Sequence, residues 1–233
     1  KISYQLYKSK LFIGILTLPI DKKNINKYAS RTFLDQTTYF SDLDNNKNSN
    51  MILKYKNKFF IPLTIHVELK NVYKYFKKKN WIINKIISLN KTLKKDFAIN
   101  NPKLVIAGIN PHSGEKGLIS EDEKKYLIPI ISKLKNNKIN IFGPVSGDGI
   151  INNENLKRFD AFIFTYHDQG LIPFKMISKN KGVNFTSGLN TIRVSPGHGT
   201  AKDIINKKKA TSKGIINCFK TINVIVKNRK KFD

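Results

Sequence analysis

The stretch LKRFDAFIFTYHDQG, residues 156–170, contains a short apolar run that stops at Tyr166 and is followed at once by His167. A run of this length between polar residues is typical of a buried strand. The stretches KNKFFIPLTIH (56–66) and PKLVIAGINPH (102–112) have the same form, and each also ends on a histidine. We therefore expect three strands whose carboxyl ends carry His66, His112 and His167.

The segments between these strands have helical periodicity. In residues 67–93 the apolar side chains recur at helical spacing, and residues 120–136 open with Ser120 and three acidic residues, which suit the first turn of a helix. The remaining expectations are a strand in 11–20, a loop at 41–50, a strand and Gly-rich loop in 138–149, an extended segment, turn and helix start in 186–210, and an amphipathic helix in 211–228. Strands that alternate with helices favour an α/β fold with a mostly parallel sheet.

The composition narrows the class of protein. The 233 residues include 43 Lys and Arg but only 16 Asp and Glu, for a formal net charge of +27. Only four of the basic residues are Arg, the better reader of phosphates and bases, so we expect no specific nucleic-acid partner and only non-specific polyanion binding at low salt. A single cysteine, Cys218, and the lack of a membrane-length apolar run predict a cytoplasmic protein with no membrane partner.

The three strand-end histidines are candidate metal ligands. Ligands of open parallel sheets bind outside the carboxyl ends of the strands, where three imidazoles would meet in one crevice. Three neutral imidazoles suit a transition metal and leave a coordination position for substrate. The spacing leaves a second interpretation open, that each histidine is a hydrogen-bonded loop residue, and no HExxH or CxxC motif decides between them.

An anion site is the second candidate feature. The turn SPGHGTAKDI (195–204) places glycines before an expected helix start, where backbone N–H groups attract phosphate; a plain turn is the alternative. Arg193 lies inside the apolar segment NTIRV, and such an Arg needs an anion or a carbonyl group. With Lys175 and Asn184, it is suited to hold a phosphorylated acid.

Four long motifs follow one another in the order of a known family: LVIAGINPHSGE, TYHDQGLIPFK, KGVNFTSGLNTIRVS and GHGTAKDI, with LTLPIDK and LTIHVELKNV before them. Over most of residues 11–222 the chain resembles the 4-hydroxythreonine-4-phosphate dehydrogenases of pyridoxal phosphate (vitamin B6) biosynthesis. The resemblance implies an isocitrate/isopropylmalate-dehydrogenase-like three-layer fold with a truncated first domain. Residues 1–29 and 204–233 would be the remnant of that cofactor-side domain, and residues 30–203 the second domain.

The resemblance also implies roles for individual residues. One divalent metal ion, Zn, Mg or Co, would be held by His66, His112 and His167. The expected substrate contacts are Gln36, Thr37, Lys175, Asn184 and Arg193, and the expected contacts with NAD or NADP are Gly197, His198 and Gly199. Two residues, Asp168 and Lys175, are candidate catalytic bases. The family forms homodimers in which the second subunit completes the active site.

The implied reaction is the NAD-dependent oxidation of 4-phosphohydroxy-L-threonine, followed by decarboxylation to 3-amino-2-oxopropyl phosphate, with the metal ion favouring ionisation of the alcohol. The chain departs from the family pattern at several places. Gln36 stands where the family has His, Gly197 where it has Asp, and the opening strand–helix units have no counterpart, so we expect either a longer natural chain or a shortened enzyme. Two alternatives therefore stay open: a dehydrogenase of 4-phospho-threonate or 4-phospho-erythronate, and a non-catalytic remnant.

Overall fold

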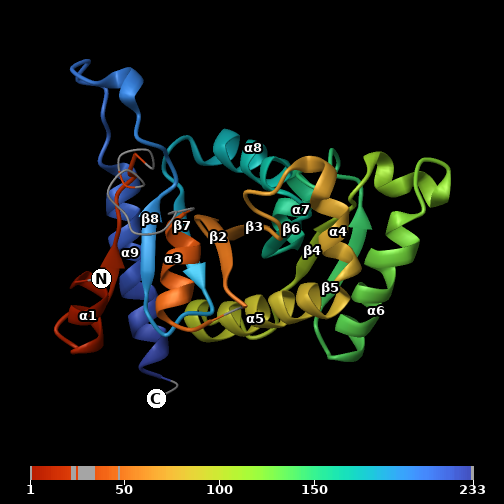
Figure 1. Ribbon diagram of the computed structural model, residues 1–233, viewed down its shortest axis with the longest axis horizontal. Helices are drawn as coiled ribbons and strands as arrows, with labels where there is room; N and C mark the ends of the chain where they lie inside the picture. The colour runs from red at the N-terminus through yellow and green to blue at the C-terminus, as the bar shows by residue number, and fades with distance from the viewer. Residues whose placement is uncertain (1, 22–24, 26–34, 47, 232–233) are drawn as a thin grey trace.

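The computed structural model describes residues 2–21, 25, 35–46 and 48–231, and the fold below is that of these residues. Their strands form one eight-stranded sheet in the order β1-β8-β7-β2-β3-β6-β4-β5 (Figure 1). The strands are β1 (Ile15–Leu16), β2 (Asn50–Tyr55), β3 (Lys58–Pro62), β4 (Leu104–Ala107), β5 (Ile141–Val145), β6 (Ala161–Phe164), β7 (Val183–Ser187) and β8 (Arg193–Pro196). Within this described sheet four neighbouring pairs are parallel and three are antiparallel, which confirms the mostly parallel α/β prediction.

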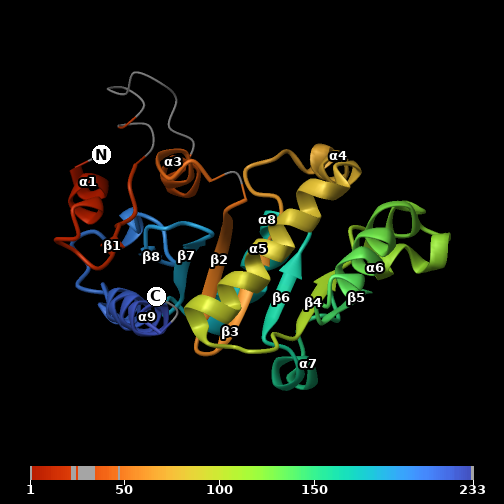
Figure 2. The ribbon, with the colours of Figure 1, turned by 90° about the horizontal axis from the view of Figure 1, so that it is seen from below.

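Helices cover both faces of the sheet. One face carries α4 (Val72–Lys77), α5 (Lys79–Phe97), α6 (Ile128–Asn136) and α9 (Lys213–Arg229), and the other carries α7 (Asn153–Arg158) and α8 (His167–Ser178). Two further helices, α1 (Ile2–Lys8) and α3 (Gln36–Leu43), lie beside β1. Figure 2 shows α5 crossing the strands on one side of the sheet, with α8 behind them. The expected three-layer arrangement is therefore confirmed.

The apolar runs form strands because alternate side chains enter opposite cores. In β3 and β6, Ile61 and Ile163 are buried against the α5 face, while Phe60 and Phe162 are buried on the α8 face. The Phe60 ring lies 5.5 Å from the Phe162 ring and 5.6 Å from that of Phe174 on α8, measured between centroids. This aromatic cluster fixes α8 against the sheet.

Several expectations about local structure were wrong. The expected loop at 41–50 contains the end of α3 and the first residue of β2, a strand that was not predicted, and α8 forms although Pro173 lies inside it. The 11–20 stretch pairs only through Ile15 and Leu16, and the expected helix start after the Gly-rich turn is one 3₁₀ turn, Lys202–Ile204. For β2, contacts distant in sequence outweigh the local pattern, because this strand pairs with both β3 and β7.

The strand arrangement places the histidine-bearing strand ends along one edge of the sheet. β3, β6, β4 and β5 are adjacent and parallel, so their carboxyl ends point the same way. Short 3₁₀ or π segments follow at Leu69–Asn71, Pro111–Gly117 and Glu123–Leu127. No helix in the described part of the chain is long and apolar enough to cross a bilayer. The proposed division into 1–29 with 204–233 and 30–203 stays a prediction.

Candidate functional site

A cavity of about 380 Å³ lies where β3 and β6 end, bounded on its other side by β8 and the Gly-rich turn. We call it the first cavity. Ten of the twelve residues predicted for the site line it. They are Gln36, Thr37, His66, His167, Lys175, Asn184, Arg193, Gly197, His198 and Gly199. The predicted residues outside it are His112 and Asp168, which line a second cavity of about 740 Å³.

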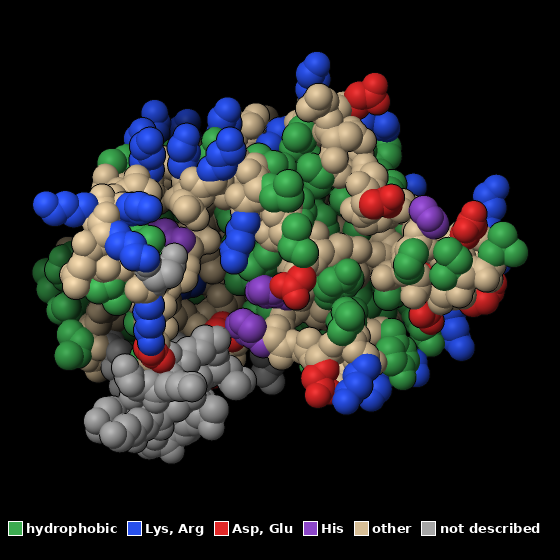
Figure 3. Space-filling model, turned by 90° about the horizontal axis from the view of Figure 1, so that it is seen from above, with side chains coloured by type: hydrophobic (Ala, Val, Ile, Leu, Met, Phe, Trp, Pro, Cys, Tyr) green, Lys and Arg blue, Asp and Glu red, His purple; other side chains and the backbone are tan. Residues whose placement is uncertain are grey.

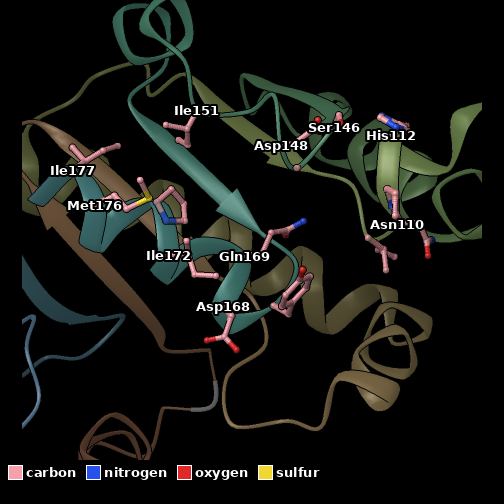
Figure 4. A pocket seen from close by; sticks show the side chains of 15 residues that line it. Asn110, His112, Ser146, Asp148, Ile151, Asp168, Gln169, Ile172, Met176 and Ile177 are labelled. Carbon is pink, nitrogen blue, oxygen red and sulfur yellow. Dashed lines mark hydrogen bonds between the residues drawn. The ribbon is translucent and has the colours of Figure 1, made fainter.

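Helix α8 forms the wall between these two cavities. His167, Leu171 and Lys175 lie four residues apart and line the first cavity. Their neighbours Asp168, Ile172 and Met176 have the same spacing and line the second cavity. In Figure 4 these last three side chains follow one another along α8, and His112 stands at the other end of the second cavity near Ser146 and Asp148. The cavity linings thus place Asp168 on one side of this segment and His167 and Lys175 on the other.

The rings of His66 and His167 lie together, with their centroids 5.8 Å apart. Each Nδ1 atom bonds a carboxylate: that of His66 lies 3.1 Å from Oδ2 of Asp35, and that of His167 lies 2.9 Å from Oδ1 of Asp168. Carboxylates in these positions fix the tautomer and orientation of an imidazole and leave Nε2 as the free ligand atom. The pair therefore has the form of two metal ligands with their supporting groups.

Asp35 is a site residue that the sequence interpretation missed. Burial raises the pKa of its carboxyl group, but hydrogen bonds from His66 and Thr38 outweigh burial and hold that pKa below its usual range. Asp35 is also the N-cap of α3, where its side chain accepts from the backbone N–H of Thr38 at 2.9 Å. Asp35 directly precedes Gln36, a predicted site residue. This neighbouring position is the feature of the sequence that could have identified it as a site residue.

The described residues of one chain do not complete a metal site. In the described part of the chain, no group of three or more His, Cys, Asp or Glu side chains is placed to hold an ion. His112 is separated from the histidine pair by α8 and lies in a turn whose backbone is left-handed. The convergence expected from strand-end spacing thus holds for two of the three histidines within a chain, and the ligand role of His112 stays a prediction.

Arg193, at the start of β8, is a buried cation at the floor of the first cavity, with only 2% of its surface exposed. Its Nε and Nη2 groups donate to Oγ1 of Thr17 at 3.0 and 2.7 Å, and Nη1 donates to Oγ1 of Thr186 at 3.2 Å. No carboxylate of the described side chains forms an ion pair with it. Burial lowers the pKa of Arg193 to about 10, against the opposing effects of Asp35 and Cys218, so the group stays charged at neutral pH.

The side chain of Gln36 is hydrogen-bonded to other groups of the protein. Its Oε1 accepts from Nη2 of Arg193 and from the Thr17 hydroxyl, and its Nε2 donates to the carbonyl of Leu18 at 3.0 Å. The structure thus shows how a glutamine occupies this position: it orients the Arg193 guanidinium. Thr17 completes the network and was not recognised in the sequence, because its role depends on β1 lying beside β8.

Two further groups offer contacts to a ligand in the first cavity. Oδ1 of Asn184 is buried and has no hydrogen-bond partner among the described residues, so it is a free acceptor in the cavity wall. Lys175 brings an ammonium group to the same cavity, whereas Asp168 is turned to the second cavity with 73% of its side chain exposed. Of the two candidate bases, Lys175 is the one that lines the first cavity.

The Gly-rich turn connects the first cavity with a third, of about 800 Å³, because His198, Gly199 and Thr200 line both. A Cβ atom on Gly199 would meet no atom within 4 Å, so the backbone there is open to a ligand. The backbone N–H of Gly197 is already bonded to the Gly182 carbonyl at 2.9 Å. The turn is therefore an open backbone surface, not a helix N-terminus.

Figure 3 shows the distribution of charge on one face of the molecule. Lys and Arg side chains gather at one end of this face, and histidine side chains appear at several separate places. The formal net charge of +27 favours anionic ligands generally.

Comparison with known proteins identifies the family. The model of "Pyridoxal phosphate biosynthetic protein PdxA" matches residues 1–222. The 4-hydroxythreonine-4-phosphate dehydrogenase of Bacteroides thetaiotaomicron is 32% identical over 97% of this chain and 62% of the relative, and that of Aquifex aeolicus is 37% identical over 90% of this chain and 64% of the relative. The chain thus spans somewhat less than two thirds of the length of these relatives.

Solved structures agree with the sequence comparison. The crystal structure of 4-hydroxythreonine-4-phosphate dehydrogenase from Klebsiella pneumoniae superposes with a TM-score of 0.81 at 25% identity. The superposition covers 97% of this chain and 68% of the other. The family match over nearly the whole chain and the shared fold lead to one conclusion: this chain belongs to the family of the pyridoxal phosphate biosynthetic protein PdxA.

Proposed function

We propose that the protein oxidises 4-phosphohydroxy-L-threonine with NAD in the presence of a divalent metal ion, and that the product decarboxylates to 3-amino-2-oxopropyl phosphate. The relatives carry the name of this dehydrogenase. The observation that carries the proposal is a buried arginine with no carboxylate partner among the described residues, in the same cavity as two carboxylate-oriented imidazoles. A phosphorylated hydroxy-acid would supply both an anion for the arginine and a hydroxyl oxygen for the imidazole pair.

Different residues of the first cavity would bind different groups of the substrate. Arg193 and Lys175 would bind its anionic groups, since a guanidinium and an ammonium group form strong charge-assisted hydrogen bonds with phosphate and carboxylate. The free Oδ1 of Asn184 would accept from the substrate ammonium group. Lys175 is the better candidate for the base, because Asp168 lines the other cavity and is bonded to His167. Gln36 would act through Arg193.

His66 and His167 would supply two metal ligands, and we propose that His112 of a second copy supplies the third. Bound there, a divalent ion would polarise the reacting oxygen. The second cavity, which contains His112, is bordered by Ile172 and Met176, whose exposed fractions are 61% and 71%. A two-fold dimer that sets this cavity against the first cavity of its partner would bury these apolar side chains and bring the imidazoles together.

The cofactor would lie across the Gly-rich turn. A dinucleotide is too long for the first cavity alone, and the shared residues His198, Gly199 and Thr200 connect that cavity to the third. The open backbone at Gly199 permits close approach of a ligand. We therefore propose that NAD or NADP lies along this turn with its reactive end toward the histidine pair.

Mixing inactive variants tests the shared site. A His112→Ala chain and a His167→Ala chain would each be inactive alone, as measured by NAD reduction with 4-phosphohydroxy-L-threonine and added Co²⁺ or Zn²⁺. After subunit exchange, half of the dimers are mixed and each has one whole site of two, so about one quarter of the wild-type activity should return.

The control mixture combines His66→Ala with His167→Ala, which damage the same half-site, and it should recover no activity. Recovery in both mixtures, or in neither despite an active wild type, would contradict the shared site. An inactive wild type that still binds Co²⁺ would direct the assay to 4-phospho-threonate and 4-phospho-erythronate. Failure to bind both metal and substrate would support the remnant alternative.

A further inference from the structure

The turn that carries His112 has an unusual backbone. Five successive residues, His112 to Lys116, have positive φ angles of 49°, 54°, 76°, 43° and 55°. Only Gly114 of the five adopts this region without steric cost, because a Cβ atom in the left-handed conformation crowds the following carbonyl oxygen. The surrounding structure must therefore hold the turn in place.

Glu123 is the side chain that holds it. This carboxylate is buried, with 3% of the residue exposed. Its Oε1 accepts from the backbone N–H groups of Ile109 at 2.9 Å and Asn110 at 2.8 Å, and its Oε2 accepts from the side-chain amide of Asn110 at 3.2 Å. Because Ile109 and Asn110 lead directly into the left-handed turn, one carboxylate fixes the point at which the chain turns.

The same carboxylate packs against the middle of the turn. A Cβ atom on Gly114 would lie 2.4 Å from Oε2 of Glu123 and 2.6 Å from the Ser120 carbonyl oxygen. The Gly114 carbonyl in turn accepts from the N–H of Ile119 at 3.2 Å. A glycine at position 114 therefore permits both the positive φ angle and the close approach of the Glu123 carboxylate.

The turn leaves the His112 ring without a hydrogen-bond partner among the described residues. Its side chain is exposed and lines the second cavity near Asp148 (Figure 4). This contrasts with His66 and His167, which are each oriented by a carboxylate bonded to the ring. His112 is oriented through its backbone instead.

We propose that Glu123 is the positioning residue for His112: it holds the left-handed turn so that the imidazole projects out of its own chain, toward the half-site of a second copy. The inference rests on the proposed function, in which His112 is a ligand in trans. Glu123 touches neither substrate nor metal ion, so its effect reaches the site only through the placement of one ring. Its loss should weaken metal binding and should behave as a partial loss of His112.

The matched variants are Glu123→Gln, which keeps the shape of the side chain, and Glu121→Gln as control. Glu121 lies in the same segment, but its side chain is exposed and pairs with Lys124 at 3.0 Å. Titration with Co²⁺, followed by its visible absorption, should give a dissociation constant raised at least about tenfold in Glu123→Gln and unchanged in the control. Amide hydrogen exchange at Ile109 and Asn110 should also accelerate in Glu123→Gln alone.

Complementation separates positioning from a general folding defect. Mixed with His167→Ala, the Glu123→Gln chain should regain tight Co²⁺ binding at the site that uses its own His66 and His167. Mixed with His112→Ala, it should not, because one site then lacks His112 and the other depends on the turn that Glu123→Gln has loosened.

Equal behaviour in the two mixtures, or wild-type affinity with wild-type exchange in Glu123→Gln, would overturn the inference. If His112→Ala binds Co²⁺ as tightly as the wild type, the shared metal site itself fails, and the proposal for Glu123 fails with it. The failure of the shared metal site is distinguishable from the failure of the Glu123 proposal alone, because it appears in a variant in which Glu123 is unchanged.

Discussion

Replacing Arg193 by Met separates the stability of the fold from the binding of an anion. Burial lowers the pKa of Arg193 from 12.5 to about 10. At ~1.36 kcal/mol for each pKa unit, burial disfavours the charged form by about 3 kcal/mol. The four hydrogen bonds that the guanidinium donates to Thr17, Thr186 and Gln36 offset this cost at roughly 1 kcal/mol each.

The two effects nearly cancel, so Arg193→Met should change the free energy of unfolding by no more than about 1–2 kcal/mol. Anion binding should respond differently, because the charged partner is lost. A hydrogen bond from the guanidinium to a charged acceptor contributes about 1.5–3 kcal/mol, more than one to a neutral oxygen, so the affinity for phosphate or for the substrate should fall by roughly 10- to 150-fold.

Urea unfolding with and without inorganic phosphate measures both quantities, with Trp81, the one tryptophan, as the fluorescent reporter. A bound anion at 100 times its dissociation constant stabilises the wild type by about 2.7 kcal/mol, and at the same phosphate concentration that increment should fall to about 0.3–1.4 kcal/mol in Arg193→Met. Arg158→Met is the control, since Arg158 is exposed and lies over the Phe142 and Phe159 rings. A variant that loses several kcal/mol without phosphate, or that phosphate stabilises as much as it stabilises the wild type, would refute the reasoning.

Two further predictions concern stability. Burial lowers the pKa of Lys85 from 10.5 to about 8. Between about pH 8 and 10.5 the unfolded chain therefore binds more protons than the folded chain. The free energy of unfolding should rise with pH across this range by up to about 3 kcal/mol. Lys85→Met should lack this rise, as urea midpoints at pH 7.5–10.5 would show, and an equal slope in both proteins would contradict the assignment. A Cβ atom on Gly182 would lie 2.1 Å from Cζ of buried Phe174, whereas one on Gly199 meets nothing within 4 Å. Gly182→Ala should therefore lower the free energy of unfolding by about 1–3 kcal/mol and Gly199→Ala should not, with thermal melting as the check.

The parts of the fold that the sequence predicts are those with strong local patterns. The runs LVIA in β4 and AFIF in β6 alternate between two apolar cores, and α9 has a regular apolar stripe. β2 was missed because its pairing with β3 and β7 is a property of the sheet, and α8 was missed because Gly170 and Pro173 are poor helix formers.

Prediction of the site had a similar limit. Local motifs identify the residue types, and ten of the predicted residues do line one cavity. The partners Asp35, Thr17 and Glu123 have no motif of their own, since each acts through a contact made by the folded chain. The placement of Asp168 and Lys175 in different cavities follows from the folded walls and not from the helical repeat, since residues seven apart lie on the same face of a helix.

The course of the segments that follow the strands explains why one chain gathers only two of the three histidines. β6 lies between β3 and β4, so the strand end before His167 is about 4.8 Å from the strand ends before both His66 and His112. A metal ion requires its ligand nitrogens at about 2.0–2.1 Å, hence within a few ångströms of one another. Helix α8 occupies the space that His112 would have to cross, and the Glu123-held turn fixes His112 on its far side. A sequence locates the ends of strands but not the course of the segments that follow them, so the separation of His112 from the pair follows only from the fold.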